Sequence, residues 1–220
     1  MAKRCIVVDL DRCSGCDSCV VACKFENNIG LGNYWNAVKP VNPVGTHPNI
    51  DMYWLPMMCQ QCENTPCVEV CPTGASYRDP DNGVVLINKE ECIGCKTCLS
   101  GCPYSDPQGA VRPSARWFNE EEAIVEKCTL CNHLTATSDG NPNRLDSSDP
   151  DHAVPPCVHN CACAARYFGD LDDPESGASK AIAKAEAEGR GVHAIEAEGV
   201  APTTRYILSK EIAAWRGLGV

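Results

Sequence analysis

The sequence predicts an α+β fold built from repeats of one small unit: a strand, a cysteine-rich loop and a short helix. Of the 18 cysteines, all but Cys5 and Cys163 fall into four spaced groups. Short β-branched stretches, Ile6–Asp9 and Val84–Asn88, run into the first and third groups and are typical of strands. From Leu171 onward there is no cysteine, so this part has a different task. An internal duplication explains the repeated surroundings of the groups.

The four cysteine groups share short and regular spacings. In chain order they are Cys13-x2-Cys16-x2-Cys19-x3-Cys23, Cys59-x2-Cys62-x4-Cys67-x3-Cys71, Cys92-x2-Cys95-x2-Cys98-x3-Cys102, and Cys128-x2-Cys131 followed after a long gap by Cys157-x3-Cys161. A proline, Pro72 or Pro103, directly follows the second and third groups.

The segments between and after the groups predict loops, one helix and one strand. Asn27–Ile50 and Thr135–Pro156 are rich in Gly, Asn, Ser and Pro, and we expect loops there. Ser176–Glu188 is rich in Ala, Lys and Glu, which favours a helix. Arg205–Leu208 is typical of a final short strand.

The composition excludes several classes of protein. The net charge is −10 and there is no basic run, which argues against nucleic acid and anionic membranes as partners. No apolar run approaches the ~18 residues that span a bilayer, and no signal peptide is visible. In a reducing compartment clustered cysteines bind metal instead of forming disulfides. We therefore expect a cytoplasmic location by the chain's own sequence, or membrane association or export together with a partner.

The spacing within the groups predicts [4Fe–4S] clusters. A Cys-x2-Cys-x2-Cys run winds a tight loop around one point and directs three thiolates inward. Gly15 and Gly94 lie between the first two ligands of their loops, where the absence of a Cβ permits close approach. The cysteine three residues further on faces elsewhere, and in two-cluster ferredoxins that cysteine ligates the other cluster and precedes a proline. The spacing therefore predicts that fourth cysteines cross over between clusters.

Zinc is the main alternative metal. A structural zinc site takes two Cys-x2-Cys pairs, or one pair with histidines. Cys128-x2-Cys131 with His133 nearby resembles such a site, but the three-cysteine runs do not fit four-coordinate zinc. The two cysteines outside the groups, Cys5 and Cys163, are expected to be buried by packing, as free cysteines commonly are.

The combined spacings resemble one family. The single x4 gap, the long gap in the fourth group, and the segments Cys71–Ala75, Glu91–Lys96 and Gly169–Pro174 are similar to the four-cluster [4Fe–4S] electron-transfer subunit of dimethyl sulfoxide reductase-type molybdopterin oxidoreductases. The resemblance covers nearly the whole chain. Cys161-Ala162-Cys163 departs from the family, which often has Cys-Pro-Thr there.

The resemblance implies two nested ferredoxin-like modules that bind four clusters, with a cysteine-free C-terminal extension. Residues 1–58 and 105–170 form the outer module, 59–104 the inserted module, and 171–220 a docking extension. The implied ligands are Cys13, Cys16, Cys19 and Cys161 for cluster 1; Cys23, Cys128, Cys131 and Cys157 for cluster 2; Cys59, Cys62, Cys67 and Cys102 for cluster 3; and Cys71, Cys92, Cys95 and Cys98 for cluster 4.

A second similarity concerns the substrate of the partner. Segments Trp117–Glu122, Lys127–Cys131 and Cys157–Cys161 are similar to the small subunit of pyrogallol–phloroglucinol transhydroxylase, which lacks several cysteines present here. This similarity points to a partner that reduces or dehydroxylates hydroxylated aromatics.

The expected function is electron transfer, and no catalytic constellation is visible. We expect a large molybdopterin-binding catalytic subunit as partner, and molybdopterin only in that partner. A membrane anchor subunit is a further candidate partner. The loop 135–156, the tail and the segment Tyr34–Trp35 are the expected docking surfaces. Two alternatives remain: a polyferredoxin-type redox subunit of a hydrogenase or formate-oxidising complex, and a zinc-stapled interaction protein.

Overall fold

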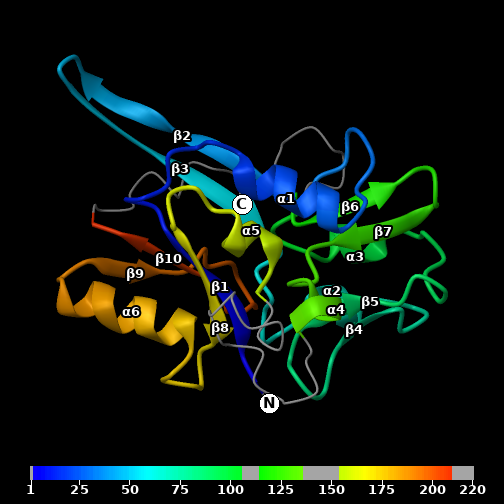
Figure 1. The fold of residues 1–220 in the computed structure, drawn as a ribbon. Coiled ribbons are helices and arrows are strands. Elements are labelled where there is room, and N and C mark those ends of the chain that lie inside the picture. Colours follow the sequence, from blue (N-terminus) through cyan, green and yellow to red (C-terminus); the bar gives the residue numbers. More distant parts are fainter. Residues whose placement is uncertain (1, 106–113, 136–153, 210–220) are drawn as a thin grey trace.

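The computed structural model describes residues 2–105, 114–135 and 154–209. Its largest sheet has the strand order β8-β1-β10-β9 (Figure 1). These strands are β1 (Arg4–Asp9), β8 (Arg166–Asp170), β9 (Gly191–His193) and β10 (Arg205–Leu208). Strand β1 pairs antiparallel with β8 and parallel with β10. The expected strands at the first group and at the C-terminal end are therefore confirmed.

Strand β1 is buried on both faces because its side chains alternate between two cores. Cys5 and Val7 pack with α6 (Gly177–Ala187), which covers one face of the sheet (Figure 1). Ile6 and Val8 belong to the larger core on the other face, where grouped cysteines lie. Helix α6 begins after Ser176, whose hydroxyl accepts from the Ser179 amide, as expected of a capping serine.

The duplicated unit appears as two strand pairs that flank cysteine groups. In the outer unit, β1 precedes the first group and pairs with β8, which follows the fourth group. In the inner unit, β5 (Val85–Ile87) precedes the third group and pairs with β4 (Ser76–Arg78), which follows the second. This pairing places the first group beside the fourth and the second beside the third.

Short helices follow the cysteine loops. Helix α1 (Ser18–Glu26) contacts α5 (Pro156–His159), and α2 (Pro66–Glu69) contacts α3 (Thr97–Ser100). The remaining elements are the hairpin of β6 (Arg116–Asn119) with β7 (Ile124–Lys127), and α4 (Asn132–Thr135). No described helix is long and apolar enough to cross a membrane.

The segment 27–50, expected to be a loop, contains most of a long β-hairpin, so that expectation is wrong. Strand β2 (Asn36–Thr46) pairs antiparallel with β3 (Asn49–Met58), and the ribbon projects from the body (Figure 1). Pro40 and Pro56 lie within the strands. A two-stranded ribbon tolerates them because each strand has a free edge, where a missing N–H costs nothing.

Two of the expected docking surfaces also have roles inside the chain, and their docking to a partner stays a prediction. Trp35 is buried, and its Nε1 donates to Glu126 Oε2 at 3.3 Å. In residues 171–209, β9 and β10 belong to the main sheet, and α6 contacts β8 and β1. Most of the third surface, loop 135–156, lies outside the described residues.

Candidate metal centres

Three pockets are each lined by four grouped thiols. The first is lined by Cys13, Cys16, Cys19 and Cys161, here called set 1. The second is lined by Cys23, Cys128, Cys131 and Cys157, called set 2. The third is lined by Cys71, Cys92, Cys95 and Cys98, called set 4. Segments far apart in the sequence thus enclose equivalent spaces.

The remaining four grouped thiols also lie together. The pKa of Cys62 is raised by burial and then by repulsion from Cys59, Cys102 and Cys67, so these four are electrostatic neighbours and are called set 3. Sets 1 to 4 have the same members as the four ligand sets that the family resemblance implied. Cluster binding by these sets stays a prediction.

The loops of sets 1 and 4 share an unusual backbone. Gly15 and Gly94 have φ of 70° and 66°, and Asp17 and Lys96, two residues further on, have φ of 59° and 60°. A Cβ on Gly15 would lie 2.2 Å from the Trp54 ring, and one on Gly94 2.2 Å from the Ala123 carbonyl oxygen. The expected reason for glycine at both positions is therefore confirmed.

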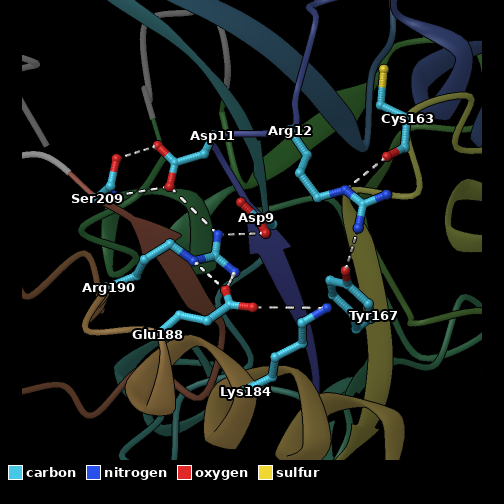
Figure 2. A network of polar contacts seen from close by, with 9 residues as sticks. All are labelled: Asp9, Asp11, Arg12, Cys163, Tyr167, Lys184, Glu188, Arg190 and Ser209. Carbon is cyan, nitrogen blue, oxygen red and sulfur yellow. Dashed lines mark hydrogen bonds and ion pairs between the residues drawn. The ribbon is translucent and has the colours of Figure 1, made fainter.

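A polar network fixes the loop of the first group against β8 (Figure 2). Arg12 donates through Nε to the Cys163 carbonyl at 3.1 Å and through Nη1 to the Tyr167 hydroxyl at 3.4 Å. Asp9, at the end of β1, accepts from Arg190 Nη1 at 2.7 Å. These contacts join the first group, the fourth group and the segment after α6, so they orient both halves of set 1.

Burial separates inner thiols from outer ones. All four cysteines of set 2 are buried, and burial raises the pKa of Cys128 to about 12. Cys16 of set 1 and Cys95 of set 4 are exposed. Hydrogen bonds from Ser18 and Thr97 lower the pKa of Cys16 and Cys95, respectively. Since metal ligation needs thiolates, the inner sites must lose protons on binding metal, whereas the outer thiols ionise more readily.

Two buried arginines near the cysteine sets show whether the surroundings of the sets suit an anionic iron–sulfur group. Arg116 Nη2 donates to Cys67 Sγ at 2.9 Å, while its Nε and Nη1 have no hydrogen-bond partner. Arg166 Nη2 donates to Asn36 Oδ1 at 3.1 Å, and its Nε and Nη1 are likewise unpartnered. A buried cation with open donors is costly unless an anionic acceptor lies nearby. A cluster with four thiolates and sulfide acceptors supplies one, so the residues fit the group.

The thiol sets differ from a site for a single metal ion such as zinc. Over the described residues, no three histidine, cysteine, aspartate or glutamate side chains converge as ligands of one ion.

Four residues near the thiols differ from the expectations drawn from the sequence. The expectation of packing for Cys163 is wrong: it is half-buried, lines the set 1 cavity and donates to Ser14 Oγ at 3.2 Å. Arg116, Arg166 and Lys127 were not foreseen near the thiols, since a single basic residue in a sequence gives no sign that it is buried. Cys5, in contrast, is fully buried, as expected.

Comparisons with known proteins agree with this arrangement. A family model described as a 4Fe-4S dicluster domain matches residues 50–171, and another with the same description matches residues 12–75. Together with the paired strands and grouped thiols, these matches define an iron–sulfur protein of the ferredoxin-like dicluster class.

Curated relatives specify the family within this class. A Halobacterium salinarum protein named as an iron–sulfur subunit of a dimethyl sulfoxide reductase is 37% identical, over 92% of this chain and 78% of the relative. A subunit of the sulfite dehydrogenase of Allochromatium vinosum is 36% identical, over 94% and 83%. The arsenate respiratory reductase iron–sulfur subunit of a Shewanella species is 37% identical, over 80% and 86%. The chain belongs to the family of iron–sulfur electron-transfer subunits of dimethyl sulfoxide reductase-type molybdopterin oxidoreductases.

Proposed function

We propose that the chain binds four [4Fe–4S] clusters, one on each cysteine set, and passes electrons singly to or from a molybdopterin catalytic subunit. The other end of the path meets a redox partner or a quinone-linked membrane subunit. A [4Fe–4S] cluster supplies a centre that gains or loses one electron, at a potential that its surroundings set. The chain itself has no catalytic role in this proposal.

The observation that carries the proposal is the order of the sets in space. Burial raises the pKa of Cys157 of set 2, and the charge of Cys19 in set 1 raises it further. The pKa of Cys128 of set 2 is raised by burial and also by the charge of Cys59 in set 3. The pKa of Cys98 of set 4 is raised by burial and also by the charge of Cys67 in set 3. These neighbour relations support a single row in the order 1, 2, 3, 4.

The two ends of this row reach the surface. Cys16 in set 1 and Cys95 in set 4 are exposed, whereas every cysteine of set 2 is buried. A row with an exposed centre at each end offers one point of entry and one of exit. This arrangement suits a protein that connects two partners.

Helix α1 supplies a surface for the catalytic partner. Its buried face holds Cys19 and Cys23, which belong to sets 1 and 2. Val21 and Phe25, one turn apart, are 52% and 85% exposed, and Leu31 beyond the helix is 99% exposed. Exposed large apolar residues are typical of interaction sites. Since relatives are named as iron–sulfur subunits of reductases, we assign this surface to the catalytic partner of such a complex.

The substrate class of the partner rests on the similarity of Trp117–Glu122 and the fourth cysteine group to a transhydroxylase small subunit. On that basis the complex reduces or dehydroxylates a hydroxylated aromatic.

Native anaerobic purification tests the function. We expect a much larger molybdopterin-binding protein to co-purify, and about 16 iron atoms per chain, as four clusters require. Incubating the complex with hydroxylated aromatics and a reductant tests the substrate. A chain that purifies with hydrogenase or formate-oxidising subunits would refute the molybdopterin partner, and an iron content near half of the expected value would refute four clusters.

The docking surface has its own test. We expect Phe25→Asp to abolish co-purification while the iron content stays complete. Ile93→Asp is the matched control, because Ile93 is 66% exposed and lies in the loop of set 4. Loss of the complex with Ile93→Asp alone would place the catalytic partner at the opposite end.

A further inference from the structure

We propose that three buried cations, Arg166, Lys127 and Arg116, occupy the three gaps between successive cysteine sets and raise the reduction potentials of the sets on both sides. This inference rests on the proposed function, since it needs clusters on the sets. It adds residues that are not ligands but determine how easily each centre accepts an electron.

Arg166 lies between sets 1 and 2. It is 4% exposed, it lines the pocket of set 1, and its charge interacts with Cys19 of set 1 and with Cys157 and Cys128 of set 2. An arginine guanidinium stays protonated in proteins, so Arg166 keeps its charge. Its Nη2 donates to Asn36 Oδ1 and to Met58 Sδ, and its Nε and Nη1 have no hydrogen-bond partner.

Arg116 has the equivalent place between sets 3 and 4. It is 1% exposed, and its charge interacts with Cys67, Cys59 and Cys102 of set 3 and with Cys98 of set 4. Its Nη2 donates both to Cys67 Sγ and to Ser76 Oγ, each at 2.9 Å. As in Arg166, Nε and Nη1 have no partner.

Lys127 lies between sets 2 and 3. It is 1% exposed, and its charge acts on both Cys67 of set 3 and Cys128 of set 2, where it partly offsets the rise in thiol pKa that burial causes. Its Nζ donates to the carbonyl oxygens of Val85 and Cys128, neither of which carries a full charge.

None of the three cations has a carboxylate within ion-pair distance among the described residues. Their positive charges therefore act on the thiolate sets with little compensation. A cation stabilises the more negative, reduced state of a nearby centre, and a dry interior screens the effect weakly. Because each cation adjoins two sets, it shifts the reduction potentials of both sets in the same direction.

Anaerobic redox titration of the full, cluster-loaded chain, followed by electron paramagnetic resonance, tests the inference. Removing one charge should lower the reduction potentials of the two adjacent sets. We expect lower potentials for sets 1 and 2 in Arg166→Gln and for sets 2 and 3 in Lys127→Met. In Arg116→Gln the potentials of sets 3 and 4 should fall. The charge-conserving variants Arg166→Lys and Arg116→Lys should retain potentials near the original values.

Arg4→Gln is the matched control. Arg4 is a buried arginine, 8% exposed, with two unpartnered nitrogens, but its charged neighbours are Asp170 and Asp79. We expect its removal to leave the potentials unchanged.

The outcomes separate the two proposals. An unaltered chain without four clusters would overturn the proposed function. Neutral variants that bind all their iron but keep their potentials would overturn the role of the cations alone. Where a glutamine variant does not bind its clusters, the lysine variant decides: unchanged potentials support the role of charge, and lowered potentials overturn it.

Discussion

At the scale of single residues, glycine is required where a cysteine loop meets another part of the chain. Gly94 has φ 66°, and a Cβ there would approach the Ala123 carbonyl to 2.2 Å. Gly74 has a similar φ of 74°, but a Cβ there would meet nothing within 4 Å. Substituting alanine at the two positions therefore separates the cost of backbone strain, present at both, from the cost of steric overlap, present only at Gly94.

Gly74→Ala should cost about 1–2 kcal/mol, because an L-residue in the left-handed region is strained. Gly94→Ala should cost clearly more, because the backbone at Ala123 must also move. The measurement is the anaerobic melting temperature of each cluster-loaded variant. Equal melting temperatures would show that the contact with Ala123 is relieved without cost.

At the scale of elements, β10 makes the C-terminal segment part of the fold. Ile207 is 1% exposed and packs with Cys5, Val7 and the alanines of α6. Tyr206 is fully buried on the other face, where its hydroxyl accepts from Gln60 Nε2 at 3.1 Å. The segment therefore stabilises β1, which leads directly into set 1.

Ile207→Ala should reduce stability by about 2–5 kcal/mol, as expected when a large buried side chain is truncated. Ile50→Ala, at a site in β3 that is 52% exposed, is the matched control and should change stability little. Thermal melting of the loaded chain distinguishes the two. Similar melting temperatures for both variants would mean that β10 contributes little to the fold.

At the scale of the whole molecule, the fold depends on the groups that the cysteines bind. Helices α2, α3, α4 and α5 have four residues each, far below the length at which a helix is stable alone. Grouped thiols are part of the main core. Ligated metal would therefore join short helices that are not stable alone.

Removal of iron with a chelator and oxidant should unfold much of the chain, with loss of far-ultraviolet circular dichroism. Iron and sulfide added under reducing conditions should restore both the spectrum and the iron content. The control is chelator without oxidant, which should leave the clusters in place. A spectrum unchanged by iron removal would show that the protein core suffices.

The local elements with clear patterns could be predicted from the sequence. The alanine-rich segment forms α6 (Gly177–Ala187), and the last strand is β10 (Arg205–Leu208), as expected. The hairpin of β2 and β3 was missed because Pro40 and nearby glycine and asparagine are typical of loops. Its long-range partner residues, such as Trp54 opposite Pro40, are not visible in local composition.

The sequence by itself determined the cysteine groups, the family and the electron-transfer class, because ligand spacing reflects the chemistry of a cluster directly. Only the tertiary structure decided that Trp35 faces inward, that Cys163 lines set 1, and that the tail pairs with β1. It alone brought the buried side chains of Arg166, Lys127 and Arg116 beside the cysteine sets. Burial and electrostatic proximity arise from contacts between distant segments, and no local pattern of residues encodes them.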